Sequence, residues 1–332
     1  MTHPPRRVAG VLFALAAGLV WGLVFVGPLL LPEYPATMQA FGRYVAFGLI
    51  ALPLGGFDRM KLARLTRADW LEALKLALVG NIVYYLFLAS SIQRAGGPVP
   101  TMIIGTLPVV IAVASKLRGA GRGARAEVRL AWSKLLPPLA LIGAGIALVN
   151  HVELQRLRAD PHADLARYAL GGLLAAGAVV CWTWYPIRNA EWLRARPDRS
   201  PRVWATAQGL MTLPLALIGY AGTWLWNLAS DEAFAMPFGP RPIDFVGLMF
   251  ALGLLASWLG TLCWNEASQR LPPALSGQLI VFETLAALGY AFVLRKAWPP
   301  AETLCGVTLL IGGVVWAVRS RPAEAGASVH PG

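Results

Sequence analysis

Long uncharged segments follow one another along almost the whole chain. Seven of them carry no charged residue: 8–31, 95–115, 135–150, 168–187, 203–230, 245–265 and 303–318. Three more, 36–57, 73–93 and 271–294, carry one charge each, on Arg43, Lys75 and Glu283. A helix needs roughly 20 apolar residues to cross a bilayer, whereas barrel strands would be shorter and would alternate in polarity. The pattern therefore predicts an all-α, polytopic membrane protein with ten transmembrane helices.

Composition supports the membrane class and argues against catalysis. Charged residues make up 14% of the chain and hydrophobic residues 57%, whereas soluble proteins contain about 25% charged residues. The four histidines fall in predicted loops or tails without metal-ligand spacing: His3, His151, His162 and His330. The adjacent acids Asp231 and Glu232 have no second acid pair with which to hold magnesium and a diphosphate. We therefore expect no enzyme activity, no cofactor and no metal site.

The net charge of +12 raises the question of a nucleic-acid partner, but the positions of the basic residues argue against one. If the N-terminus is cytoplasmic, the predicted inner loops hold 20 Lys and Arg residues and the outer loops hold seven. Membrane proteins show this excess in their cytoplasmic loops. The charge therefore predicts orientation, with both termini in the cytoplasm.

The two halves of the chain share weak similarities in the same order. LFALAAGLVW (12–21) aligns with LLAAGAVVCW (173–182) at an offset of 161, SIQRAGGPVPTMIIGTLP (91–108) with ASQRLPPALSGQLIVFET (267–284) at 176, and LIGAGIALV (141–149) with LIGGVVWAV (310–318) at 169. Pro35 and Pro201 open the second and seventh predicted spans. Because five helices per half is an odd number, the second half must enter the membrane from the opposite side. The pattern predicts an inverted repeat, in which the substrate site lies near the midplane between the halves.

These segments resemble the drug/metabolite transporter superfamily, specifically its ten-helix EamA-type members. The resemblance rests on ALAAGLVWGLVFV (14–26), FGRYVAFGLIALPL (41–54), YYLFLASSIQRAGGPVPTMIIGTLPVVIAV (84–113) and QRLPPALSGQLIVFETLAAL (269–288) with LLIGGVVWAV (309–318). It implies EamA-like repeats at 8–150 and 168–318, a short disordered tail at 319–332, and a bacterial inner-membrane carrier that exports amino acids or other small metabolites. The family often has a proline after the glutamate of the ninth helix, whereas Thr284 follows Glu283 here and Pro108 stands in the first repeat. This departure predicts a ninth helix without a hinge.

Glu283 and Arg43 are the strongest candidates for a functional site. At about 1.5 Å per residue, Glu283 lies about 15 Å from Pro273 and Arg43 about 12 Å from Pro35, so both fall near the midplane. A charge there costs about 3 kcal/mol or more unless it faces protein or water. If the two residues pair, they form an architectural latch; if they lie apart, desolvation favours the neutral carboxyl and makes Glu283 a proton carrier. A purely structural Glu283 and an Arg43 that anchors a substrate carboxylate are further alternatives.

Aromatic and amide residues within the spans supply the other candidates for the solute pathway: Asn81, Tyr84, Trp182, Trp258, Gln208 and Tyr290. Tyr290 falls on the predicted helical face of Glu283, and the amides either bridge helices or line a cavity. A cavity of rings and one carboxylate suits amphipathic or cationic solutes through stacking and cation-π contacts.

The sequence thus predicts a secondary active transporter that works by alternating access and exports small metabolites, with proton coupling as an option. The alternatives are a sugar- or nucleotide-type carrier and a non-transport membrane scaffold or pore. Its partners would be a small solute and the lipid bilayer, and the small-residue faces of helices five and ten would pack the scaffold or a homodimer contact.

Overall fold

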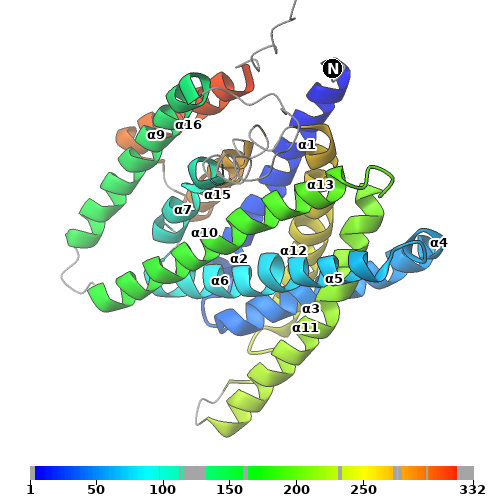
Figure 1. Ribbon diagram of the computed structural model, residues 1–332. Coiled ribbons are helices and arrows are strands. Elements are labelled where there is room, and N and C mark those ends of the chain that lie inside the picture. Colours follow the sequence, from blue (N-terminus) through cyan, green and yellow to red (C-terminus); the bar gives the residue numbers. More distant parts are fainter. Residues whose placement is uncertain are drawn as a thin grey trace, which may run out of the picture.

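The computed structural model describes residues 4–96, 98–111, 114, 132–159, 164–230, 234–271, 275, 279–296 and 298–319. These residues are helical apart from short turns and loops and contain no strand, which confirms the all-α prediction (Figure 1). Residues 320–332, which hold almost all of the predicted tail, lie outside the described residues.

Six described helical stretches are long and apolar enough to cross a bilayer: Arg7–Leu30, Ala36–Phe57, Arg67–Ala95, Leu165–Arg194, Pro201–Ala229 and Pro242–Arg270. Shorter apolar helices lie at Leu136–Leu148, Val281–Leu294 and Ala301–Gly313. Each of these stretches coincides with one of the ten predicted spans. The chain is therefore a multi-span membrane protein, while the count of ten crossings stays a prediction.

The elements follow the predicted halves. The first half contains α1 (Pro4–Gly22), η1 (Leu23–Phe25), α2 (Gly27–Leu30), α3 (Ala36–Phe57), α4 (Arg59–Leu62), α5 (Arg67–Leu76), η2 (Ala77–Val83), α6 (Tyr84–Ala95), α7 (Pro98–Ile104) and α9 (Trp132–Arg158). The second contains α10 (Leu165–Arg194), α11 (Pro201–Ala229), α12 (Pro242–Leu252), η3 (Gly253–Leu259), α13 (Gly260–Arg270), α15 (Val281–Arg295) and α16 (Ala301–Arg319). Proline opens or precedes several of these helices, where its missing N–H is not needed.

The fourth and ninth predicted spans are broken rather than continuous. After α7 the chain turns at residues 105–106 before it becomes helical again, and Ile280 lies in a turn just before α15. The prediction that the ninth span has no hinge is therefore wrong, because the break occurs without a proline. Glu283 lies in the first turn of α15, and its N–H donates to the carbonyl of Ile280 at 2.9 Å, a tighter i to i−3 hydrogen bond.

Two π-helical segments interrupt the third and eighth spans. η2 begins at Ala77 and η3 begins at Gly253, 176 positions later, and both are seven residues long. This offset equals the one that aligns 91–108 with 267–284. Because π-helical turns are rare and often lie at functional sites, their matched positions favour the predicted repeat and draw attention to the residues on them.

Helices of one half pack against helices of the other. α1 packs on α13 and α15, and α10 packs on α6 and α7. Under the predicted repeat, α1 corresponds to α10 and α13 to α6, so the two packed pairs are equivalent. α3 packs along α11, which corresponds to it. The contacts of the two halves are therefore reciprocal.

α9 and α16 lie side by side at one edge of the molecule (Figure 1). Their contact depends on small residues: a Cβ on Gly145 would stand 2.5 Å from the carbonyl oxygen of Gly306, and one on Gly313 would stand 2.7 Å from Ile142. Glycine lets the two backbones approach closely. The small-residue faces predicted for helices five and ten thus meet each other, and a homodimer contact stays a prediction.

Candidate functional site

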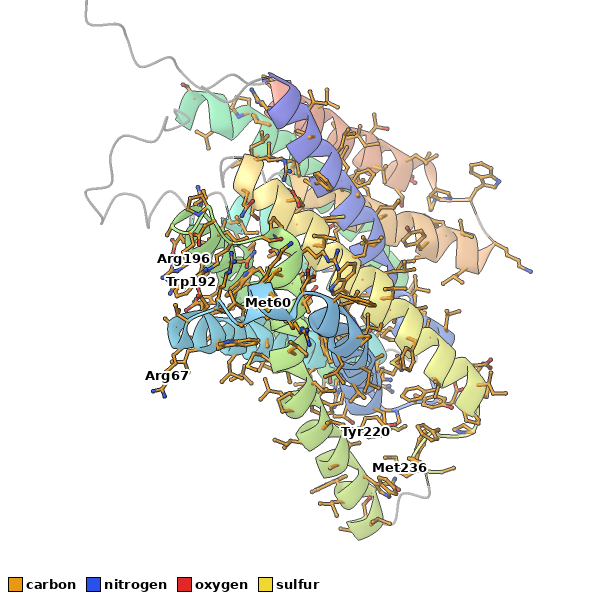
Figure 2. All side chains as sticks on the ribbon, turned by 90° about the vertical axis from the view of Figure 1, so that its right-hand side faces the viewer. Met60, Arg67, Trp192, Arg196, Tyr220 and Met236 are labelled. Carbon is orange, nitrogen blue, oxygen red and sulfur yellow. The ribbon has the colours of Figure 1, made fainter. Side chains whose placement is uncertain are left out.

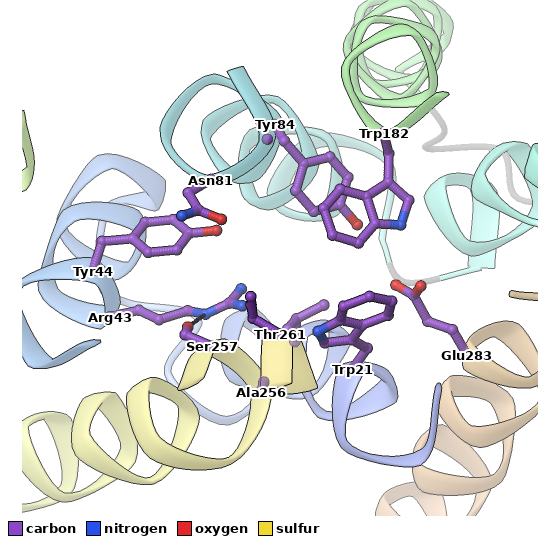
Figure 3. A pocket seen from close by; sticks show the side chains of 12 residues that line it. Trp21, Arg43, Tyr44, Asn81, Tyr84, Trp182, Ala256, Ser257, Thr261 and Glu283 are labelled. Atoms are coloured by element: carbon purple, nitrogen blue, oxygen red, sulfur yellow. Dashed lines mark hydrogen bonds between the residues drawn. The ribbon is translucent and has the colours of Figure 1, made fainter. Parts of the chain in front are cut away.

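A small cavity lies in the middle of the bundle, and both halves contribute to it (Figure 3). It is lined by Trp21, Val24, Arg43, Tyr44, Gly80, Asn81, Tyr84, Trp182, Ala256, Ser257, Thr261 and Glu283. Asn81 is 14 residues from each end of the span Arg67–Ala95, so the cavity lies about 21 Å along the helix from either end. Its volume of about 10 Å³ holds about one water molecule.

Arg43 enters the cavity from α3 and is almost fully buried. Its Nε donates to the Oγ of Ser257 at 2.9 Å, and its guanidinium carbon lies 4.9 Å from the ring centroid of Tyr44 and 4.4 Å from that of Tyr85. These contacts compensate part of the cost of burying the charge. One nitrogen, Nη1, has no hydrogen-bond partner. Arg43 is therefore held in place with a donor to spare.

Glu283 enters from the N-terminal turn of α15 and is also buried. α1 passes close to it: a Cβ on Gly18 would stand 3.0 Å from the backbone nitrogen of Glu283. Its Oε2 has no hydrogen-bond partner. The carboxylate lies across the cavity from Arg43, and the indoles of Trp21 and Trp182 lie between them (Figure 3). Among the described residues no ion pair joins the two charges, so they are not paired as a latch in this conformation.

Aromatic rings form the wall between the two charges. Trp21 and Trp182 meet edge to face with centroids 5.0 Å apart, and Trp182 stacks on Tyr84 at 4.6 Å and on Tyr185 at 4.8 Å. Trp21 and Trp182 are the residues that the sequence aligns at an offset of 161. Each half therefore supplies one indole to the same contact.

Four buried polar atoms around the cavity lack a hydrogen-bond partner: Arg43 Nη1, Tyr84 Oη, Trp182 Nε1 and Glu283 Oε2. An unsatisfied buried polar group costs about 1–3 kcal/mol. The arginine and indole nitrogens can only donate, an ionised carboxylate can only accept, and the phenol can do either. The site can therefore bind a ligand that carries both acceptors and a donor.

Five of the eight predicted pathway residues meet at this cavity: Glu283, Arg43, Asn81, Tyr84 and Trp182. Asn81 also bridges helices, since its Nδ2 donates to the Oγ1 of Thr212 at 3.0 Å. The other three do not line the cavity. Gln208 accepts from the Tyr185 hydroxyl at 2.8 Å, Trp258 Nε1 donates to Thr206 Oγ1 at 3.2 Å, and the Tyr290 hydroxyl donates to the Leu19 carbonyl at 3.0 Å.

The sequence analysis missed Ser257, Thr261, Gly80 and Ala256. The offset of 176 between the halves could have found two of them, because it relates Asn81 to Ser257 and Gly80 to Ala256. Gly80 has a steric role, since a Cβ there would stand 2.1 Å from the ring of Tyr185. Each π-helix thus brings one small residue and one polar residue to the cavity.

One end of the bundle, residues 58–72 with 188–202, is closed by charges and is called the basic end below. Its three ion pairs each join the two halves: Asp58 to Arg202 at 2.9 Å, Asp69 to Arg199 at 2.9 Å, and Glu72 to Arg188, whose Nη2 lies 3.0 Å from Oε2. Nearby, the guanidinium of Arg196 stacks on Trp192 at 3.5 Å (Figure 2).

The opposite end, residues 30–36 with 234–244, is closed mainly by an aromatic plug. Tyr34 is fully buried, stacks on Phe245 at 4.8 Å, donates to the Phe238 carbonyl at 3.0 Å and accepts from the Arg241 N–H at 2.7 Å. Arg241 also donates to Glu33 at 2.7 Å. A backbone hydrogen bond and this guanidinium hold the pKa of Glu33 below its usual value. Both ends are therefore closed by contacts between the halves.

Comparison with known proteins gives three matches. The model of the EamA-like transporter family matches residues 8–119. The inner membrane protein YtfF of Escherichia coli (strain K12) is 55% identical over 315 residues, which cover 95% of this chain and 96% of that protein. A solved structure described as "Crystal structure of protein" superposes with a TM-score of 0.66 at 18% identity, over 94% of this chain and 98% of that chain, and shares the fold.

Proposed function

Because the chain belongs to the EamA-like transporter family, we propose that it is a secondary active carrier of small amphipathic or cationic metabolites, amino acids among them. The proposal includes ten helices in two inverted repeats, alternating access and export. Its site is the central cavity.

The observation that carries the proposal is the pair of separated charges at mid-membrane depth. Arg43 and Glu283 are buried on opposite sides of one cavity, and each keeps a polar atom without a partner. Charges at such depth are costly and are retained in membrane proteins mainly for function. A purely structural pair would be satisfied by its neighbours, whereas these two groups leave donors and acceptors for a solute or a proton.

The residues have complementary roles in this proposal. Glu283 takes the cationic group of the solute or a proton, and Arg43 anchors an anionic group such as a carboxylate. The rings of Trp21, Trp182 and Tyr84 hold the apolar or cationic body of the solute by stacking and cation-π contacts. A polyphosphate is a poor candidate, because Arg43 is the only basic side chain that lines the cavity in the described structure.

Closure at both ends supports alternating access over a pore. The cavity holds about one water molecule, so a metabolite can enter only when contacts at one end break and the helices move apart. Because both closures join the first half to the second, relative motion of the halves would open one end while the other stays shut. The conformation described is then the occluded intermediate of the cycle.

The test uses purified protein in proteoliposomes. A thermal-shift screen against amino acids, amines and nucleosides first identifies a solute that stabilises the native state. That solute is then followed in counterflow, which a carrier supports and a passive pore does not, and in uptake driven by a pH gradient.

The decisive variant is Glu283→Gln, with Glu302→Gln as the matched control because Glu302 is an exposed glutamate at the start of α16. We expect Glu283→Gln to abolish gradient-driven uptake and the control to retain it. Uptake of the wild-type kind by Glu283→Gln would contradict the role of this carboxylate. Absence of counterflow in the wild-type protein for every stabilising solute would contradict the carrier proposal itself.

A further inference from the structure

A second cavity lies at the basic end, separate from the central one. It is an open groove of about 430 Å³ between α3, α4, α5 and α11, lined by Leu52, Gly55, Arg59, Leu62, Ala63, Leu65, Trp70 and Leu210. Arg59 is the one charged side chain among these residues. The volume falls in the range of about 300–1,000 Å³ typical of small-molecule sites. The groove is therefore large enough for an apolar ligand with a charged end.

The surface around the groove is apolar. The exposed fractions are 49% for Leu52 on α3 and 58% for Leu71 on α5, and Phe57 and Met60 at the turn into α4 are 82% and 71% exposed (Figure 2). Large apolar side chains gathered in this way face lipid in a membrane protein. The mouth of the groove is therefore expected at the boundary between acyl chains and headgroups.

Positive charge surrounds the same segment without compensation. Its exposed basic residues are Arg59, Lys61, Arg64 and Arg67, and none has a carboxylate partner within the described part of the chain. The local acids are already occupied, since Asp58 pairs with Arg202 and Asp69 with Arg199. Four positive charges thus remain available to a ligand beside an apolar groove.

We propose that this groove binds one anionic phospholipid of the leaflet at the basic end. An acyl chain lies along Gly55, Leu62 and Leu210, and the phosphate headgroup is bound by Arg59 and its basic neighbours. Clusters of basic residues next to apolar membrane surface favour anionic lipids, at about 1 kcal/mol or fivefold in affinity per residue. This site goes beyond the proposed transport function and does not depend on the identity of the solute.

The position of the groove gives the lipid a structural consequence. α4 is a single turn of four residues that joins α3 to α5, and α11 belongs to the other half. A lipid in the groove contacts all four elements beside the ion pairs that close the basic end. Its binding therefore stabilises the closed form of that end.

The experiment uses the full-length protein, delipidated in detergent and titrated with phosphatidylglycerol, with phosphatidylcholine of the same acyl chains, or with inorganic phosphate. Native mass spectrometry counts bound lipid and a thermal shift reports stability. We expect one phosphatidylglycerol to bind and to raise the melting temperature, with weaker binding of phosphatidylcholine and no shift with phosphate. Equal effects of the two lipids would overturn the charge argument, and an equal effect of phosphate would overturn the groove argument.

Two variants locate the site. Arg59→Gln with Arg64→Gln is expected to lower the affinity for phosphatidylglycerol about 30-fold, at about fivefold per residue. The control pair, Arg94→Gln with Lys296→Gln, removes two exposed charges outside the groove and should leave the affinity unchanged. Leu52→Trp, on an exposed position at the groove wall, should reduce binding of both lipids. An equal loss in the control pair would place the lipid elsewhere and overturn the proposal.

Discussion

Replacing Asp69 by asparagine should open the basic end of the bundle. Asp69 is completely buried, and its carboxylate accepts from Arg199 Nη2 at 2.9 Å and from Trp192 Nε1 at 3.2 Å. It also accepts from the N–H and hydroxyl of Thr66 in the capping box that starts α5. Asparagine keeps the shape of the side chain and can still accept from Thr66 N–H, but it removes the negative charge that holds the arginines of the second half.

The size of the effect follows from the burial of the partners. Removing one partner of a buried ion pair costs about 3–5 kcal/mol. The side chains of Arg199 and Arg196 remain 18% and 32% exposed, so water can solvate them in part once the carboxylate is neutral. A cost of about 2–3 kcal/mol for the closed basic end is therefore expected. That cost shifts the equilibrium between the closed and open forms of this end about 30- to 150-fold.

The shift can be measured by thiol labelling from each side of the membrane. The three native cysteines are replaced by alanine, and a cysteine is placed at Ala256, which lines the central cavity and is buried. Asp69→Asn should increase the labelling rate by an impermeant reagent added at the side of the basic end, and should lower it from the other side.

The control for this experiment is Asp164→Asn. Asp164 caps α10 through the N–H of Arg167 and is exposed, so the exchange leaves the ion pairs at the basic end intact. Labelling of Asp69→Asn at the same rate as this control, or an equal increase from both sides, would refute the assignment of Asp69 to the closure of one end.

Two further predictions concern packing and pH. Gly22→Ala should lower the stability of the purified protein by about 1–3 kcal/mol in a denaturation assay, because the added Cβ would stand 2.7 Å from that of Ala286, whereas Gly289→Ala, with open space around it, should be neutral or stabilising; equal effects would contradict the close packing of α1 on α15. Because the pKa of Glu33 is lowered in the folded protein, its pairing with Arg241 stabilises the protein above the ordinary pKa of 4.5 and is lost as the pH falls through the folded value, so the difference in melting temperature between wild-type protein and Glu33→Gln should disappear in acid; a difference that persists or grows there would refute this.

The hydrophobic pattern predicts the helical class and most spans, because burial in lipid requires long apolar helices whatever their packing. It fails at Glu283, which was expected in the middle of a continuous helix and lies in the first turn of α15. A break that depends on packing between α1 and α15, rather than on proline or glycine, leaves no trace in hydropathy. Pathway residues were found where a polar or charged side chain interrupts an apolar span, as at Arg43 and Asn81.

Residues whose role depends on distant partners were harder to predict. Ser257 holds Arg43 across 214 positions, and Asp69 meets Arg199 across 130. Small polar residues such as serine are common in transmembrane helices, so Ser257 gives no signal by itself. Asp69 stands among the charges of a predicted loop, where a solvated side chain is the ordinary interpretation. Only the fold shows that it is buried.

The two indoles that separate Arg43 from Glu283 also bear on energy conservation in the cell. A proton crosses a membrane along an unbroken file of water or exchangeable groups, and a cavity that holds about one water molecule between stacked rings provides no such file. The closed conformation is therefore an electrical insulator. A carrier that spends most of its time in this form does not discharge the gradient on which the bacterium's other transporters depend.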